Sequence, residues 1–271
     1  MFMLATFNSE RASAPPRGGE SFWRAFLALY VASLIALSPS LAAEAANPSV
    51  VSSSEIRLEK ALAEARKNYQ SNPTNYDAAW KFARAAFEWA DNTDNQDHTS
   101  VANEGIEAAH AAITLKPSGA EGHYYLALNV GQIARTKSLS ALRMVKQMEQ
   151  EFKKSIEIDP GLDFAGACRS LGMLYTDVPG WPVSIGNKSK GRELLQKAVQ
   201  LYPEFPDNQI TLAEAYRKAG DFKTLRQKLD GMEKQIELAR KQLSGELWAQ
   251  SWSDWNKRWR EVKQGLQSSD R

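Results

Sequence analysis

The chain has 271 residues, and 34 Lys and Arg against 32 Asp and Glu give it a net charge of +2. A charge so close to neutral gives no general reason to bind nucleic acid. The single cysteine, Cys168, excludes an intramolecular disulfide and a metal site built on a cysteine cluster. His98, His110 and His123 have no pair at the i, i+4 spacing that places two imidazoles on one helix face. We therefore expect no metal and no other cofactor.

The N-terminal region has the order of a secretory signal peptide. Ala25–Leu37 is a continuous apolar run that follows Arg24, and it is too short to span a bilayer, which needs about 20 residues. Small residues follow it, which favours cleavage near Ala42–Ala45. We expect residues 1–45 to be a signal peptide and the mature protein to be periplasmic or secreted. The alternative is a membrane anchor that stays uncleaved, which Pro39 disfavours.

After a polar linker at residues 46–54, prolines recur at a nearly constant interval. Pro73, Pro117, Pro160 and Pro203 are separated by 44, 43 and 43 residues, and each stands between two helical runs. Proline cannot continue a helix but is tolerated just before a new one, so this spacing predicts a helical repeat. The expected helices are 55–71, 75–90, 99–115, 119–136, 142–158, 162–176, 188–201, 206–219, 221–243 and 246–266.

Matched pairs of large and small side chains follow each proline. They are Phe82-Ala83, Leu126-Ala127, Leu171-Gly172 and Leu212-Ala213. A second set of mostly small residues precedes each proline by five and by twelve positions. That set is Asn68, Ala112, Ser155 and Ala198, with Ala61, Gly105, Met148 and Gly191. Small side chains allow helices to approach closely, so we expect these positions in the interior of the helix pairs.

This pattern resembles the tetratricopeptide repeat (TPR), most closely at Leu212-Ala213-x-x-Tyr216 and the turn Gly220-Asp221. The TPR unit is 34 residues long, whereas the unit here is 43–44. The enlarged unit, Asn129-Val130-Gly131-Gln132 and the loop Pro179–Lys188 resemble a subgroup of the family. That subgroup includes the bacterial T component associated with TRAP transporters (TatT-like) and a related eukaryotic microtubule-regulator family.

The resemblance implies an all-α, right-handed TPR-like solenoid over residues 55–243. It implies a protein that binds a protein or peptide partner. It also implies an alternative role, as an accessory component of a TRAP-type transport system that binds a periplasmic solute-binding protein or a small apolar ligand. No nucleophile–base motif, zinc-protease motif or glycine phosphate loop is present, and Cys168 is expected to be a small buried side chain. We therefore do not expect an enzyme.

The candidate binding residues lie on one helix and one loop. Tyr124, Asn129, Gln132 and Arg135 belong to a first helix, and first helices line the concave face of such solenoids. Ordinary hydrogen bonds between helices explain these side chains equally well. Trp181 lies between Pro179 and Pro182, and we expect it to fold back and fill the gap between repeats. The alternative is an anchor at the mouth of a groove.

Two further segments have distinctive patterns. The acidic run Asp91–Asp97 lacks the spacing of an EF-hand, so it predicts a solvated loop with Thr99 or Ser100 as the next N-cap. Residues 244–271 form a Trp-rich tail, in which four tryptophans are spaced by 4, 3 and 4 and continue to two aliphatic residues. These are Trp248, Trp252, Trp255, Trp259, Val262 and Leu266. We expect this stripe to cap the repeat that starts at Pro206 and to face the helix 221–243; the alternative is contact with a membrane surface or a partner.

Overall fold

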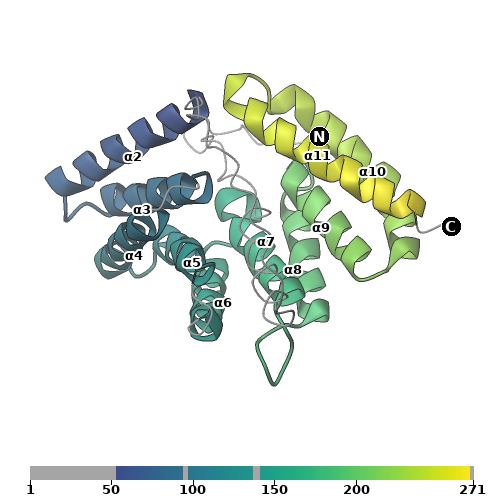
Figure 1. Cartoon of the computed structure of the whole chain (residues 1–271), viewed down its shortest axis with the longest axis horizontal. Helices are drawn as coiled ribbons and strands as arrows, with labels where there is room; N and C mark the ends of the chain where they lie inside the picture. Colours follow the sequence, from purple (N-terminus) through teal and green to yellow (C-terminus); the bar gives the residue numbers. More distant parts are fainter. Residues whose placement is uncertain (1–52, 94–96, 137–140, 269–271) are drawn as a thin grey trace, which may run out of the picture.

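The computed structural model describes residues 53–93, 97–136 and 141–268, and these fold into ten α-helices (Figure 1). The helices are α2 (Ser53–Ser71), α3 (Tyr76–Asp91), α4 (His98–Leu115), α5 (Ala120–Ala134), α6 (Ala141–Ile158), α7 (Leu162–Asp177), α8 (Lys188–Leu201), α9 (Pro206–Lys218), α10 (Phe222–Gln242) and α11 (Glu246–Ser268). Each expected helix agrees with its observed counterpart to within two residues at both ends. The predicted signal peptide lies outside the described residues, and the last two residues of the predicted linker begin α2.

Polar caps and proline begin the helices where the sequence pattern placed them. The side chain of Asn75 accepts a hydrogen bond from the Ala78 amide at the start of α3, and Asp221 does the same for Thr224 in α10. Each such bond satisfies an amide that the first helical turn leaves free. Helix α4 begins at His98 after Asp97, so the N-cap lies two residues before the expected Thr99.

The helices pack as four pairs, α3/α4, α5/α6, α7/α8 and α9/α10, flanked by α2 and α11. The first helices of successive pairs also contact one another: α3 with α5, α5 with α7 and α7 with α9. Because these helices are drawn together, they occupy the inner side of the curve. Figure 1 shows the result as an arch that runs from α2 to α11. We call the side formed by α3, α5, α7 and α9 the concave face.

The matched large and small residues occupy the core, as expected. Leu126 and Ala127 are fully buried, and their counterparts in the other three units are buried too. The small residues allow the two helices of a pair to touch. A Cβ atom on Gly172 of α7 would lie 2.8 Å from the Leu195 side chain of α8, and one on Gly191 of α8 would lie 2.8 Å from the Gly172 carbonyl oxygen. Cys168 is buried as well.

Helix α2 departs from the repeat pattern. Ala61 and Asn68, which match interior positions of the later units, are exposed. The helix instead directs Leu62 into the core, with Leu58 and Tyr69 packed partly against it. Helix α2 packs mainly on α3 and is joined to α4 by the partly exposed ion pair between Arg66 and Glu104 at 2.8 Å. The positions that later units use for a second packed neighbour therefore face solvent.

The Trp-rich helix α11 caps the solenoid, as expected, but its main partner is α9 rather than the expected helix 221–243, which it reaches through individual contacts with Glu233, Arg240 and Leu243. All six residues of its apolar stripe are buried, at 9% exposure or less, and α11 packs on α9. The Trp255 ring meets Phe205 edge-on at 5.6 Å, and Trp252 Nε1 donates a hydrogen bond to the Leu243 carbonyl at the end of α10. The stripe therefore offers no free apolar face, and membrane contact through it is not supported. No helix among the described residues is both long and apolar enough to cross a membrane.

Candidate binding surface

The structure buries three of the four candidate residues on α5. Tyr124, Asn129 and Gln132 are at most 1% exposed, whereas Arg135 is half-buried. Asn129 Nδ2 donates to the Ala83 carbonyl of α3 at 2.9 Å and to the Tyr125 carbonyl at 2.8 Å. This side chain therefore joins α5 to α3. Hydrogen bonding between helices was the alternative that the sequence left open for Asn129.

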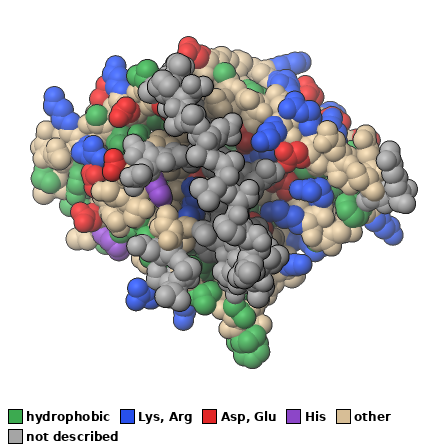
Figure 2. Space-filling view, in the orientation of Figure 1, with side chains coloured by type: hydrophobic (Ala, Val, Ile, Leu, Met, Phe, Trp, Pro, Cys, Tyr) green, Lys and Arg blue, Asp and Glu red, His purple; other side chains and the backbone are tan. Residues whose placement is uncertain are grey.

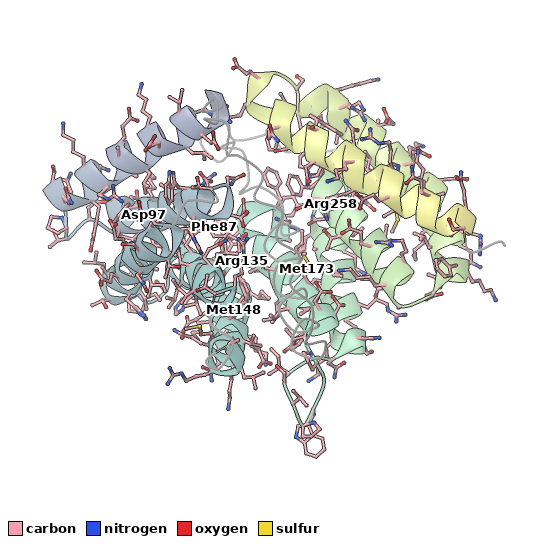
Figure 3. All side chains as sticks on the ribbon, viewed as in Figure 1. Phe87, Asp97, Arg135, Met148, Met173 and Arg258 are labelled. Carbon is pink, nitrogen blue, oxygen red and sulfur yellow. The ribbon has the colours of Figure 1, made fainter. Side chains whose placement is uncertain are left out.

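Gln132 and Arg135 form a second connection between the same two helices. Gln132 Nε2 donates to Asp91 Oδ1 at 3.0 Å, and Arg135 Nη1 donates to Gln132 Oε1 at 2.9 Å. Arg135 also approaches Asp91 Oδ1 at 3.7 Å, and Figure 3 labels it near the middle of the arch. Asp91, expected in a solvated loop, is instead a buried residue at the end of α3.

Trp181 lies in the loop between α7 and α8 and is 90% exposed. The prediction that it fills the gap between repeats is therefore wrong. Val178, at 6% exposure, and the partly buried Ile185 pack against the core instead, one on each side of the loop tip. Nothing in the spacing of the prolines distinguishes the tryptophan from its two aliphatic neighbours as the residue that turns inward.

A row of side chains along α3 was not predicted from the sequence. Trp80, Arg84 and Glu88 are spaced i, i+4, i+8 on a helix otherwise rich in alanine, and that interruption is the signal that could have found them. Trp80 stacks on Tyr125 of α5 with ring centroids 6.0 Å apart, and Arg84 Nε lies 2.6 Å from Glu88 Oε1. Aromatic and charged groups thus lie together where α3 meets α5.

Asp163 of α7 completes this group from the third unit. Its Oδ2 accepts a hydrogen bond from the Tyr124 hydroxyl at 2.7 Å. Burial raises the pKa of Asp163, and the guanidinium groups of Arg169 and Arg84 offset part of that rise. Arg84 of the first unit and Asp163 of the third are close enough for their charges to interact, and both belong to first helices, which form the concave face. We call Trp80, Arg84, Glu88, Tyr125 and Asp163 the concave cluster.

The backbone at the start of α7 is unusual. Asp163, Phe164 and Ala165 have φ values of 53°, 54° and 61°, in the left-handed region that costs about 1–2 kcal/mol for a residue with a Cβ. Residues held in such conformations concentrate at ligand-binding sites. The strained turn lies at the concave cluster, because Asp163 belongs to both.

A regular set of hydrogen bonds connects each unit to the next. Each acceptor is an acidic residue in the first turn of a first helix: Glu121 accepts from Tyr76 at 2.6 Å and Asp163 from Tyr124 at 2.7 Å. Asp207 continues the series with an ion pair to Arg169 at 2.9 Å. The three acceptors are spaced by 42 and 44 residues, so the series follows the repeat. We call it the inter-unit ladder.

The ladder ends at Arg258 of α11, which Figure 3 labels beside α9. The buried guanidinium donates to Asp207, to the Thr211 hydroxyl at 3.0 Å and to both carboxylate oxygens of Glu214 at 2.9 and 3.0 Å. Burial alone would raise the pKa of Asp207, but Arg258 and Arg169 outweigh it and hold that pKa below its usual value. This set of bonds attaches the cap to the last unit.

Comparison with known proteins agrees with this architecture. The chain matches a thermophilic TPR protein from Thermus thermophilus at 17% identity and a TM-score of 0.54, over 90% of this chain and 98% of that one. The fold is a right-handed TPR-like α-solenoid. Two structures of MamA are also similar, both at 17% identity, with TM-scores of 0.48 and 0.46 over 69% and 71% of this chain and 94% and 90% of theirs.

Residues 48–173, just under half of the chain, match the sequence profile of the family described as Regulator of microtubule dynamics protein 1-3. The sequence pattern also resembles a family of microtubule regulators. No curated protein matches the chain. The resemblance to the TRAP-associated T component stays a prediction.

Proposed function

We propose that this TPR-like solenoid is an exported, non-catalytic scaffold that binds a segment of a protein partner along its concave face. The observation that carries the proposal is the convergence of Trp80, Arg84 and Glu88 of α3 with Tyr125 of α5 and Asp163 of α7. TPR-like solenoids present extended concave surfaces, and such surfaces suit an extended peptide.

The chemistry of the concave cluster fits a peptide ligand. Arg84 supplies a planar set of N–H donors for a carboxylate or a backbone carbonyl, and Glu88 and Asp163 accept from amides. The partly exposed Trp80 ring, held by stacking 6.0 Å from the buried Tyr125 ring, offers a rigid apolar surface between these charges. A short polypeptide segment carries the complementary donors, acceptors and apolar side chains.

A photo-crosslinking amino acid tests the proposal. Placed at Arg84 on the concave face, it is expected to capture a defined partner from the cell fraction that contains the mature protein. The matched control carries the same group at Glu107, an exposed position on α4, the second helix of that pair. Equal capture at both positions, or capture at Glu107 alone, would contradict binding on the concave face.

The transport-accessory alternative predicts a different ligand surface. A small apolar ligand needs a pocket lined mainly by apolar side chains, whereas charged groups alternate with aromatic ones in the concave cluster. For this reason we favour the peptide scaffold. Co-purification of the protein with TRAP permease subunits or a solute-binding protein would reverse that preference.

Export is the second part of the proposal, supported by the apolar run Ala25–Leu37 and the small residues after it. We expect the secreted form to begin near Asn47. N-terminal sequencing of the exported protein checks this, and an intact Met1 or Met3 would refute cleavage.

A further inference from the structure

The tip of the α7–α8 loop is the most exposed apolar feature of the described surface. Trp181 is 90% exposed and Val183 is 49% exposed, and Pro182 between them is also exposed. Figure 1 shows this loop projecting away from the body of the arch, and Figure 2 shows hydrophobic side chains at its projecting end. Single exposed apolar residues are common on protein surfaces, but three consecutive ones at a projecting tip indicate an interaction site for an apolar surface.

Backbone hydrogen bonds join the two sides of the loop stem and hold the tip in this exposed position. The Gly186 amide donates to the Pro179 carbonyl at 2.9 Å, and the Asn187 amide donates to the Tyr175 carbonyl at 2.8 Å. Gly186 is required here, because a Cβ atom would lie 2.1 Å from the Val178 carbonyl oxygen. A tip held by such bonds loses little conformational entropy on binding.

Positive charge lies directly behind the apolar tip. Lys188 and Lys190 are exposed, and residues 180–190 contain no Asp or Glu. Within the part of the chain that the structure describes, neither lysine forms an ion pair, whereas Asp177 at the other end of the loop pairs with Lys218 at 3.1 Å. From the tip towards the body of the protein, the loop therefore presents two apolar side chains first and two lysines behind them.

We propose that this loop binds the surface of an anionic lipid bilayer, with Trp181 and Val183 in the interfacial layer and the two lysines beside the lipid phosphates. The indole ring is suited to the headgroup layer because it joins a large apolar surface to one N–H donor. Each lysine near an anionic surface strengthens binding about fivefold. A projecting, convex tip matches a bilayer better than a protein partner, which would need a pocket shaped for the tip.

Fluorescence quenching by brominated lipids tests the proposal on the full chain. The vesicles contain phosphatidylglycerol and phosphatidylcholine with bromine on the acyl chains. The chain has eight tryptophans, so the signal of Trp181 is the quenching lost on going to Trp181→Ala. We expect a clear loss of quenching and an affinity for the vesicles at least about tenfold lower, the effect of withdrawing a large apolar side chain from water. Any binding by residues 1–45 is common to both proteins.

Two further variants make the result specific. Leu238→Ala removes a side chain that is 44% exposed on α10 and should bind vesicles normally. Lys188→Gln with Lys190→Gln should weaken binding at low salt, and the difference should shrink at high salt as the charges are screened. All variants change exposed side chains, so circular dichroism should show unchanged melting. If bromine quenches Trp181→Ala as strongly as the unsubstituted protein, Trp181 does not enter the bilayer and the proposal fails.

Discussion

Arg258 of α11 forms a bidentate ion pair with Glu214 of α9, and both side chains are buried. A planar guanidinium matches a carboxylate in this geometry, and removing one partner leaves a buried charge without compensation. We therefore expect Arg258→Ala to lower the free energy of unfolding by about 3–5 kcal/mol.

Urea denaturation measures that loss, and Lys263→Ala is the matched control on the same helix. Lys263 pairs with Glu233 at 2.9 Å, but both side chains are partly exposed, so its removal should cost at most about 1 kcal/mol. Equal losses in the two variants would show that the buried ion pair contributes no more than a surface one.

Leu212→Ala tests the register of the repeat. Leu212 is 3% exposed beside Ala213 in α9, and truncation of a buried leucine typically costs about 2–5 kcal/mol. We expect a loss of about 2–4 kcal/mol in chemical denaturation. A loss below about 0.5 kcal/mol, the range of surface substitutions, would contradict the assignment of this residue to the core.

Removal of the cap tests whether α11 is required for a stable solenoid. Truncation after Leu243 would expose Phe205 and the face of α9 on which α11 packs, and would leave Asp207 and Glu214 without Arg258. We expect earlier melting and aggregation, measured by circular dichroism and gel filtration. A truncated protein that remains monomeric and equally stable would contradict the capping role.

The lowered pKa of Asp207 predicts part of the acid sensitivity of the fold. Its folded pKa lies below the unfolded value of about 3.9, held there by Arg258 and Arg169 against the effect of burial. Stabilisation from the carboxylate is therefore present above that unfolded value and is lost as the pH falls through the folded pKa. Asp207→Asn should be less stable than the unsubstituted protein at pH 7, and the gap should narrow towards pH 3. A gap independent of pH would contradict this.

The raised pKa of Asp163 predicts that its negative charge stabilises the fold less than that of Asp207. Its raised pKa means that burial penalises the ionised form, and its φ of 53° favours Asn as much as Asp. In Asp163→Asn the amide oxygen still accepts from Tyr124. We expect a change within about 1 kcal/mol, measured beside Asp207→Asn under the same conditions. A loss as large as that of Asp207→Asn would show that the charge of Asp163 is needed.

The helices and the core followed from the sequence because local signals specify them. Pro117 and the other repeated prolines fix where each pair begins, and Leu126-Ala127 with its counterparts fixes which face turns inward. Helix α2 showed the limit of that signal, since Ala61 matches the pattern but lies exposed. Its burial depends on the number of neighbouring helices, which the pattern within one unit does not encode.

The candidate surface was less predictable because a polar side chain can bind either a ligand or a neighbouring helix. Asn129 was correctly placed on a first helix, but the choice between a ligand and a neighbouring carbonyl depends on the distance to Ala83, set by the packing of α5 on α3. Arg258 was not identified from the sequence, because the tryptophans around it form the more conspicuous pattern. Its position three residues after Trp255 and four before Val262 places it at the edge of the buried stripe, which is the signal that could have identified it.

The two ends of the inter-unit ladder are attached differently, so the repeats should unfold in a definite order along the chain. In a linear array each repeat is stabilised by contacts with its immediate neighbours. Unfolding should therefore begin at the end that is less firmly attached. At one end Arg258 joins α11 to α9 through buried charges, while at the other α2 packs on α3 with an exposed outer face. Amide hydrogen exchange should therefore be fastest in α2 and slow progressively towards α9, so that a partner bound near α3 would protect the part of the array that opens first.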